Sequence, residues 1–301
     1  MKRRAPGSQP AGPLRLVTGG SRPDPSPAAE HPSQWSRPHV RSLAIASGKG
    51  GVGKSMLAAN LAIALGERGA RVLLVDADFS QANLDLLLGV HPRWDLQHVL
   101  QGEKTLEEIV VQGPAGVRLV PAASGAPELT DLDDYRLESL WRGMSQLEND
   151  ADVVLIDTAS GVHRTVTWLC HAAREVLVVT SPEMPAFSDA YALIKLLHQQ
   201  GLTQPPHLVV NRADGAEEAE EVAHRLRLVA RRFLSLELDL WGSVPADPAV
   251  ARAQRLQQPL LTAFPQAPVS AAIRALSEYL WDVVPPEPRV QPDTQPQRLE
   301  A

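Results

Sequence analysis

The sequence predicts an α/β protein with a doubly wound, mainly parallel sheet flanked by helices. Short apolar runs without polar alternation are typical of strands buried on both faces, and they cover residues 43–47, 72–75, 117–120, 153–156, 176–180, 208–210 and 240–244. Segments with helical periodicity separate most of these runs and cover residues 54–68, 133–148, 187–200, 216–232 and 247–257. This alternation indicates parallel strands joined by right-handed crossovers, with ligands bound beyond the carboxyl ends of the strands.

Proline-rich segments at the two ends of the chain limit the expected domain. Residues 1–39 are punctuated by prolines and contain few apolar side chains. They cannot bury enough surface to offset the entropy lost on ordering. Residues 285–301 have the same character. We therefore expect two disordered tails around a single domain at residues 40–284.

The composition excludes several classes of protein. The 301 residues carry a net charge of -6, so no global basic field attracts the chain to nucleic acid. Cys170 is the only cysteine, which rules out an internal disulfide and a cysteine pair that holds zinc or an iron–sulfur cluster. No apolar run approaches the roughly 18 residues that span a bilayer. These features predict a soluble, cytoplasmic protein.

A glycine-rich loop follows the first expected strand and precedes the first expected helix. Residues 48–55 read G-K-G-G-V-G-K-S, a Walker A-type loop in the context that its mechanism requires. Its glycines let backbone N–H groups approach phosphate oxygens, and the helix presents its positive end to the same anion. Lys54 can reach the β- and γ-phosphates, and Ser55 can bind magnesium. The predicted nucleotide contacts here are Gly48, Gly50, Gly51, Val52, Gly53, Lys54, Ser55 and Met56.

Three aspartates follow apolar strands. Asp76 and Asp78 end the second expected strand, and Asp157 ends the fourth in a Walker B pattern. Carboxylate oxygens are ligands that magnesium prefers. Asp76 and Asp78 alternate along the strand, so their side chains cannot have the same role. Acids that only cap the following turns are the alternative. Residues 157–161 would form a loop that senses the γ-phosphate.

Lys49 has no place in an ordinary intramolecular phosphate loop. With K-G-G-V-G-K-S taken as a unit, the chain resembles the deviant Walker A loop of the MinD/ParA ATPases, which are P-loop NTPases. The resemblance covers about residues 40–282. It implies that Lys49 reaches across a dimer interface to the partner's nucleotide, that Asp78 orients the attacking water, and that Asp76 contacts the water shell of the Mg²⁺ bound with ATP. A mere surface lysine is the alternative.

The base is expected beside the ends of the last two strands. Asn211 can pair with both a donor and an acceptor of adenine, and the resemblance implies that an Asn here reads that base. The GTPase motif N-K-x-D is absent because Arg212 stands in place of the lysine, which favours ATP over GTP. Pro245 and Asp247 match the family's second loop around the base. An ordinary turn residue is the alternative for Asn211.

Further segments resemble the flagellar number regulators called FlhG, FleN or YlxH. They are residues 76–78 with 83–85, 120–125, 188–195 and 263–265. The resemblance implies an ATP-dependent homodimer that regulates flagellar number and placement. Its partners would be an SRP-type GTPase, FlhF, or a flagellar transcription activator. The chain departs from this group at residues 79–81 and 183–187, and residues 12–15 are at most a remnant of the amino-terminal GTPase-activating motif.

Two segments could contact a membrane or DNA. Ile273, Leu276 and Leu280 form one stripe of a helix expected at residues 270–282, but its polar side has few basic residues, so packing on the core is favoured over membrane binding. Transient association with the inner face of the cell membrane is the alternative. The basic run at residues 224–232 spreads around a helix, which favours a solvated face over a DNA contact.

The sequence suggests four possible functions. The first is an ATP-switched regulator with slow, partner-stimulated hydrolysis. The second is a metal-cluster ATPase, which Cys170 alone disfavours because such proteins need bridging cysteines. The third is a partitioning or positioning ATPase that acts on DNA or membrane. The fourth is a nucleotide-gated scaffold that hardly hydrolyses ATP.

Overall fold

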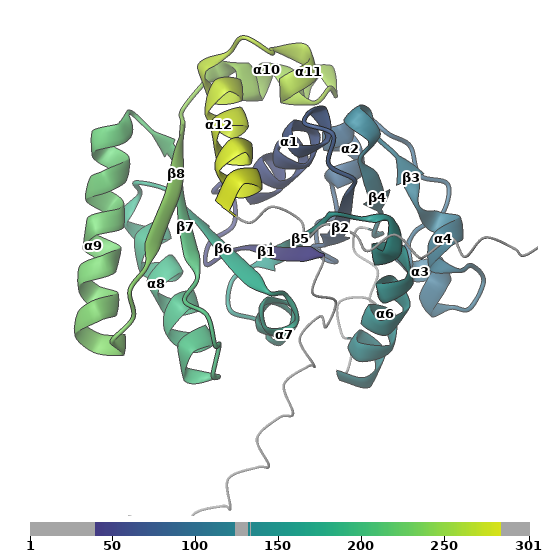
Figure 1. Cartoon of the computed structure of the whole chain (residues 1–301), viewed down its shortest axis with the longest axis horizontal. Coiled ribbons are helices and arrows are strands. Elements are labelled where there is room, and N and C mark those ends of the chain that lie inside the picture. Colours follow the sequence, from purple (N-terminus) through teal and green to yellow (C-terminus); the bar gives the residue numbers. More distant parts are fainter. Residues whose placement is uncertain (1–39, 124–131, 133, 284–301) are drawn as a thin grey trace, which may run out of the picture. The chain divides into compact units, whose positions relative to one another are not determined.

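The computed structural model describes residues 40–123, 132 and 134–283, so the expected tails at residues 1–39 and 285–301 lie outside the described residues. Eight strands are found in the described residues: β1 (Arg41–Ser47), β2 (Val72–Ala77), β3 (Val111–Gln112), β4 (Arg118–Val120), β5 (Val153–Ser160), β6 (Glu175–Thr180), β7 (His207–Ala213) and β8 (Asp239–Pro245). They form one sheet in the order β3-β4-β2-β5-β1-β6-β7-β8 (Figure 1). Neighbouring strands are parallel except for β3 and β4.

The doubly wound, mainly parallel sheet predicted from the sequence is therefore confirmed. Six of the seven predicted apolar runs lie within a strand, and the run 117–120 begins one residue before β4. The two-residue strand β3 was missed because it is too short to produce an apolar run. One boundary prediction is wrong: residues 157–160 are not a loop, since β5 continues to Ser160, where it still pairs with Ser47 of β1. Only Gly161 of the expected sensing segment lies beyond the strand.

The helices follow the predicted periodicity where they are long. The expected segments correspond to α1 (Lys54–Glu67), α6 (Asp134–Leu147), α8 (Met184–Gln199), α9 (Ala216–Leu234), α10 (Pro248–Leu256) and α12 (Pro268–Val283). The helices not anticipated are α2 (Leu84–Leu88), α3 (Leu96–Leu100), α4 (Leu106–Ile109), α7 (Arg164–Ala172) and α11 (Leu260–Ala263). Helices α2, α3, α4 and α11 have fewer than two turns, which is too little for a repeat of 3.6 residues to stand out. Helix α7 is as long as α10, so its length does not explain why it was missed.

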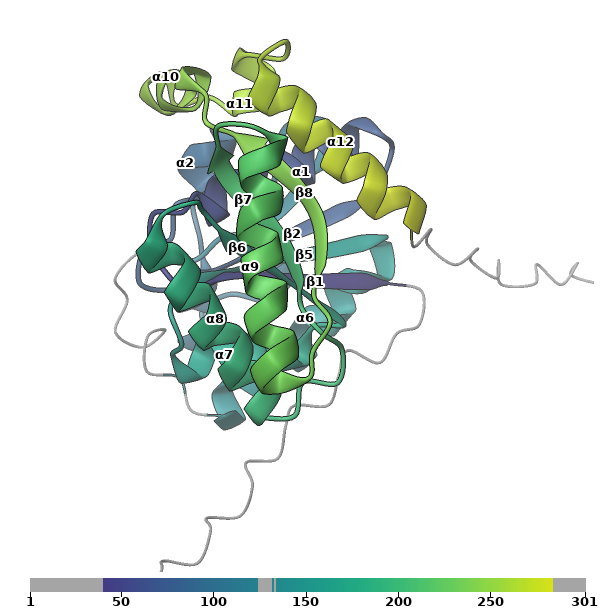
Figure 2. The ribbon, with the colours of Figure 1, turned by 90° about the vertical axis from the view of Figure 1, so that its left-hand side faces the viewer.

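Helices cover both faces of the sheet, so successive side chains of a strand point alternately into two hydrophobic cores. In β1, Leu43 and Ile45 pack with α1, α10, α11 and α12, whereas Ala44 and Ala46 pack with α6, α7, α8 and α9. Figure 1 shows α1, α10, α11 and α12 above the sheet and α6, α7 and α8 below it. Figure 2 shows α12 and α9 on opposite sides of β8. Burial on both faces explains why the central strands read as continuous apolar runs.

The last helix packs on the domain core, as its sequence favours. Ile273, Leu276 and Leu280 are buried against the layer that contains α1. Three surface ion pairs also join α12 to the carboxyl end of α1: Arg274 contacts Glu67, and Arg68, the residue after α1, contacts both Glu278 and Asp282. No helix within the described ranges combines the length and the apolar character needed to cross a bilayer.

Truncating the buried stripe of α12 should destabilise the fold. Ile273 is 0% exposed, so Ile273→Ala should lower the free energy of unfolding by about 2–5 kcal/mol through lost burial and a cavity. Asp282→Ala is the control on the same helix, because the Asp282 side chain is 72% exposed, and it should change stability by less than about 0.5 kcal/mol. Urea unfolding measures both. Equal, negligible losses would show that α12 does not contribute to the core.

Candidate functional site

The predicted site residues meet at one edge of the sheet. The glycine-rich loop joins β1 to α1. Asp76 lies near the carboxyl end of β2, Asp78 directly follows that strand, and Asp157 lies in β5, which is next to β2 in the sheet. Asn211 and Arg212 lie at the end of β7, and Pro245 ends β8. Because these strands are parallel, their carboxyl ends share one edge, and site residues between positions 48 and 247 of the chain come together there. This is the edge at which the sequence predicted ligand binding.

Glycine is required in this loop for two different reasons. Gly53 begins α1 with a φ of 92°, in the left-handed region where other residues are strained. At Gly48 the constraint is space, because a Cβ there would overlap the backbone carbonyl of Asp189 in α8. The loop therefore packs closely against α8, and the amino end of α1 directly follows the loop. That helix end has unsatisfied N–H groups and a partial positive charge suited to an anion.

Lys54 and Asp157 form a buried ion pair at the centre of the site. The Nζ of Lys54 lies 2.6 Å from Oδ1 of Asp157, and the two side chains are 5% and 0% exposed. Burial raises the pKa of Asp157 above its ordinary value, although the Lys54 charge opposes this. Among the described residues, Oδ2 of Asp157 has no hydrogen-bond partner. A buried carboxylate oxygen without a partner costs free energy unless a donor or a cation satisfies it.

The residues around this oxygen suit a hard divalent cation. Ser55 follows Lys54, and its Oγ lies 3.5 Å from the lysine Nζ, so a hydroxyl and a carboxylate both lie near one ammonium group. Magnesium prefers such oxygen ligands and retains water in its remaining positions. The donor set and the unsatisfied Oδ2 of Asp157 therefore fit Mg²⁺.

Asp76 holds the segment that follows β2. Its carboxylate accepts hydrogen bonds from the backbone N–H groups of Asp78, Asn83 and Leu84 at 3.1–3.2 Å. Burial raises the pKa of Asp76 well above its ordinary value, and the nearby Asp157 charge adds to the rise. The sequence predicted a role in metal binding, and the structure adds a structural role: Asp76 fixes the path of the chain into α2.

Asp78 lies on that same segment. Its Oδ1 accepts hydrogen bonds from Ser80 Oγ at 2.7 Å and from the backbone of Gln81 at 3.1 Å. The Asp78 side chain is buried, and its charge is among the causes that raise the pKa of Asp157. The two aspartates that end β2 therefore have different surroundings, in agreement with the expectation that they cannot have the same role.

Lys49 forms an ion pair at the surface. Its Nζ lies 2.8 Å from Oε2 of Glu183, and the side chains are 35% and 55% exposed. Lys49 lowers the pKa of Glu183. No hydrogen bond or ion pair within the described residues joins Lys49 to Lys54 or Asp157. Sequence reasoning missed Glu183 as its partner. The sequence holds no signal for this pair, because the contact depends on β6, which precedes Glu183, lying next to β1 in the sheet.

A hollow of about 440 Å³ lies beside the loop, at the ends of β7 and β8. Six of the predicted nucleotide contacts line it: Gly53, Met56, Asn211, Arg212, Pro245 and Asp247. The wall that sequence reasoning missed is mainly the first turns of α10, where Val250, Ala251 and Gln254 face the hollow. Asp247 begins this helix, since its Oδ1 accepts a hydrogen bond from Ala249 N at 2.8 Å. The helical periodicity of 247–257 could have indicated which residues face the site.

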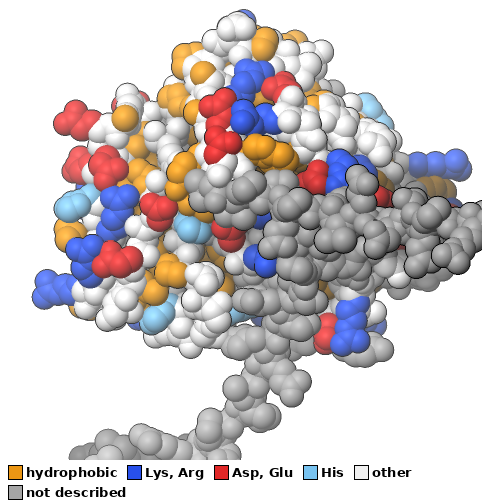
Figure 3. Space-filling model, in the orientation of Figure 1, with side chains coloured by type: hydrophobic (Ala, Val, Ile, Leu, Met, Phe, Trp, Pro, Cys, Tyr) orange, Lys and Arg blue, Asp and Glu red, His pale blue; other side chains and the backbone are white. Residues whose placement is uncertain are grey.

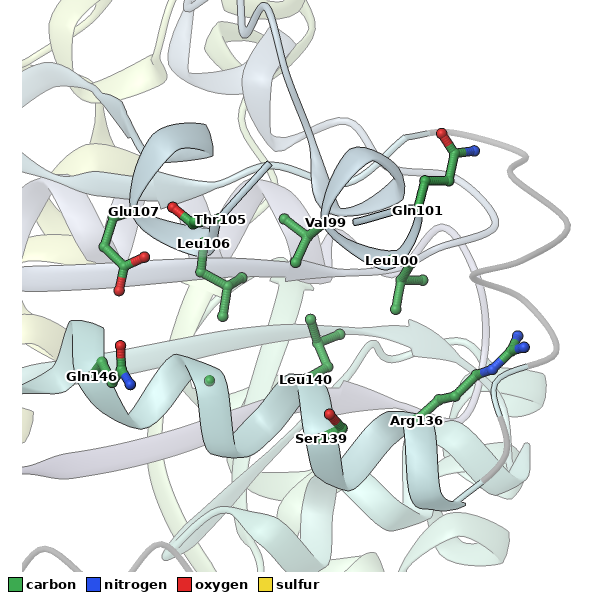
Figure 4. Close-up of a pocket in the computed structure, with 11 residues that line it drawn as sticks. Val99, Leu100, Gln101, Thr105, Leu106, Glu107, Arg136, Ser139, Leu140 and Gln146 are labelled. Atoms are coloured by element: carbon green, nitrogen blue, oxygen red, sulfur yellow. The ribbon is translucent and has the colours of Figure 1, made fainter. Parts of the chain in front are cut away.

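A second, larger hollow lies away from this edge. It has a volume of about 610 Å³ and separates α3 and α4 from α6. Figure 4 shows Val99, Leu106 and Leu140 pointing into it, with polar side chains at its ends. None of the predicted site residues line it. It therefore adds nothing to the chemistry of the phosphate loop.

Comparisons with known proteins agree with this geometry. The profile of the CobQ/CobB/MinD/ParA nucleotide binding domain matches residues 43–260. The antiactivator FleN of Pseudomonas aeruginosa is 38% identical over 253 residues, which cover 83% of this chain and 90% of FleN. The flagellum site-determining protein YlxH of Helicobacter pylori is 33% identical over 207 residues, 68% of this chain and 70% of YlxH. The septum site-determining protein MinD of Pyrococcus horikoshii, solved with Mg-ADP, is 28% identical with a TM-score of 0.68 over 81% of this chain and 97% of that one.

Removing one member of the buried ion pair should destabilise the nucleotide-free protein. Lys54→Ala leaves the Asp157 carboxylate buried without its cation and should lower the free energy of unfolding by about 3–5 kcal/mol. The double change Lys54→Met with Asp157→Asn removes both charges and nearly keeps the volume, so it should recover most of that loss. Urea unfolding at neutral pH compares the variants. A double variant as unstable as Lys54→Ala would mean that the uncompensated charge is not the cause.

Proposed function

Because this chain belongs to the MinD/ParA family of nucleotide-binding ATPases, we propose that it is a molecular switch that dimerises with Mg-ATP, hydrolyses ATP slowly and regulates the number or placement of flagella. The observation that carries the proposal is the arrangement at the edge of the sheet. The phosphate loop, the buried Lys54–Asp157 pair and the hollow beside Asn211 lie together there, and a second lysine stands at the surface.

The buried ion pair supports a change in partner when nucleotide binds. Lys54 would leave Asp157 for the β- and γ-phosphates, and backbone N–H groups of residues 48–53 would surround those phosphates. Ser55 and Asp157 would hold Mg²⁺, with Asp76 near its water shell, and the bound ion neutralises charge on the phosphates. The base would occupy the hollow between Asn211 and α10.

The surroundings of Lys49 support a role across a dimer interface. The lysine is partly exposed and forms a surface ion pair with Glu183, and such pairs are worth about 0–1 kcal/mol, so little free energy is needed to separate them. Lys49 is then available to the phosphates of a second copy, where its charge would act as an arginine finger does. Asp78 would orient the attacking water, since it follows β2, which pairs with the part of β5 that contains Asp157.

The flagellar part of the proposal rests on similarity to FleN and YlxH. An SRP-type GTPase of the FlhF kind, or a flagellar transcription activator, is the proposed partner. We place the protein in the cytoplasm, with transient contact to the inner face of the membrane where the partner requires it. The apolar stripe of α12 is already buried in the core, so that helix would not supply such a contact while folded.

A DNA partner has less support. The basic run of α9 is largely neutralised by neighbouring acids: Arg225 pairs with Glu221, Arg227 with Glu220, and Arg231 with Glu237. Figure 3 shows acidic and basic side chains interspersed over the face on which α9 lies in Figure 1. DNA binding without sequence preference depends on several cations that neutralise phosphates. Arginines that are already paired with glutamates are less available for such contacts.

Two substitutions should separate dimerisation from hydrolysis. Asp78→Ala removes the residue that orients the water and should slow hydrolysis by about 10²–10⁴-fold, while ATP binding and the dimer persist. Lys49→Ala removes the cation that acts in trans and should slow it by about 10³–10⁵-fold, with nucleotide bound to a monomer. Size-exclusion chromatography with light scattering in Mg-ATP detects the difference. Lys195→Ala changes an exposed lysine on α8 and is the control. If the Lys49→Ala variant dimerises and hydrolyses ATP as the Lys195→Ala variant does, the role in trans is refuted.

The cellular role has a separate test. Deleting the gene in its own organism should change the number or position of flagella per cell, because the regulator is lost, and electron microscopy counts them. The wild-type gene should restore the pattern, and a gene encoding the Asp78→Ala variant should not, since its dimer cannot be released by hydrolysis. Unchanged flagella after deletion would remove the flagellar assignment and leave the ATP switch to stand on the biochemical result.

A further inference from the structure

The side chain of Asn211 already has two hydrogen bonds before any ligand is considered. It is 2% exposed. Its Nδ2 donates to the backbone carbonyl of Val52 in the phosphate loop at 2.6 Å, and its Oδ1 accepts from the backbone N–H of Arg212 at 3.0 Å. One amide therefore joins the end of β7 to a loop that lies 159 residues earlier in the chain.

A bulge at the end of β7 produces the second of these bonds. The register between β7 and β8 shifts between Asn211, which pairs with Val244, and Ala213, which pairs with Pro245. The extra residue is Arg212, whose φ of 61° lies in the left-handed region that non-glycine residues rarely adopt. The strained backbone turns the N–H of Arg212 toward the Oδ1 of Asn211. Bulges and strained residues of this kind are concentrated at functional sites.

These two contacts fix which end of the amide points where. Rotating the amide by 180° would place Oδ1 against the carbonyl oxygen of Val52 and the NH₂ group against the N–H of Arg212. One contact would then place two acceptors together and the other two donors, in a buried site where polar atoms need a hydrogen-bond partner. The observed orientation is therefore the one that the protein itself can satisfy.

The locked amide retains one donor and one acceptor for a ligand. Nδ2 has a second hydrogen and Oδ1 a second lone pair. Adenine presents an acceptor at N7 and a donor at N6, whereas guanine presents acceptors at both N7 and O6. Guanine would meet the Oδ1 of Asn211 with an oxygen, and the amide cannot rotate to avoid it. The Val52 carbonyl and the Arg212 N–H would in this way impose a preference for adenine that a freely rotating amide would lack.

The same amide lies against the phosphate loop itself. A Cβ on Gly53 would overlap the Nδ2 of Asn211. Gly53 also begins α1, so the contact lies at the point where the loop turns into the helix. Losing the hydrogen bond would free the carbonyl of Val52 and loosen the N–H groups on either side of it.

We infer that Asn211 is a positioning residue for the phosphate loop as well as a residue that contacts adenine, with its amide locked by Val52 and Arg212. The inference rests on the proposed function, since it assumes that nucleotide binds at this edge. It adds that base recognition and phosphate binding share one side chain. Replacing Asn211 should then weaken the binding of a phosphate chain that has no base.

Inorganic tripolyphosphate, ATP and GTP, each with Mg²⁺, are the ligands for calorimetric titrations. The wild type should bind ATP more tightly than GTP by about 10-fold or more and should bind tripolyphosphate measurably. Asn211→Ala should reduce the preference for ATP over GTP and weaken tripolyphosphate by about 10-fold, the effect of one lost buried hydrogen bond. Asn211→Leu keeps the branched shape without the amide and should behave in the same way. Asn149→Ala, the same change on an exposed residue after α6, should leave all three affinities unchanged.

The outcomes separate this inference from the proposed function. If the Asn211 variants lose affinity for ATP but bind tripolyphosphate as the wild type does, the residue contacts only the base and the inference is wrong. Equal wild-type affinities for ATP and GTP would show that the locked amide does not select adenine over guanine. If the wild type binds neither ATP nor tripolyphosphate, the proposed function fails instead. Should Asn211→Ala not fold, as judged by urea unfolding, the Asn211→Leu variant decides by the same titrations.

Discussion

The site depends on one constraint: a charged pair is buried where the sheet ends. Lys54 and Asp157 are almost completely removed from water, and their attraction compensates for desolvation only while both are present. The pair requires β1 and β5 to be neighbours in register, which the sheet order provides. It also leaves Oδ2 of Asp157 unsatisfied in the described structure. When an anion and a cation enter such a site together, the lysine can bind the anion and the carboxylate can bind the cation.

Close contacts connect this centre to the other strand ends. The absence of a side chain at Gly48 lets α8 approach the loop, and at Gly53 it makes room for Asn211. Asp76 fixes the segment that carries Asp78 through hydrogen bonds to backbone N–H groups. A displacement of the loop would therefore shift β7 and α8, which contact it directly. These contacts give the proposed switch a physical basis, because close-packed interiors transmit small shifts.

Local patterns explain where sequence reasoning succeeded and where it failed. The seven apolar runs were found because burial on both faces removes polar alternation, and the long helices because several turns repeat the same stripe. Strand β3 and helices α2, α3, α4 and α11 were missed because each is short. The end of β5 was misplaced because Asp157 and Thr158 are polar, although their backbones still pair with Asp76 and Ala77 of β2. Polarity indicated a loop, and backbone pairing decided otherwise.

By itself, the sequence determined the α/β class, the loop between β1 and α1 and the strand ends that carry Asp76, Asp157 and Asn211, because glycine patterns and apolar runs are local signals. Only the tertiary structure decided how these groups are paired: Lys54 with Asp157, Lys49 with Glu183, and Asn211 with the carbonyl of Val52. These partners are 103, 134 and 159 residues apart. Their contact depends on the order of strands in the sheet and on helix packing, which no local pattern in the chain encodes.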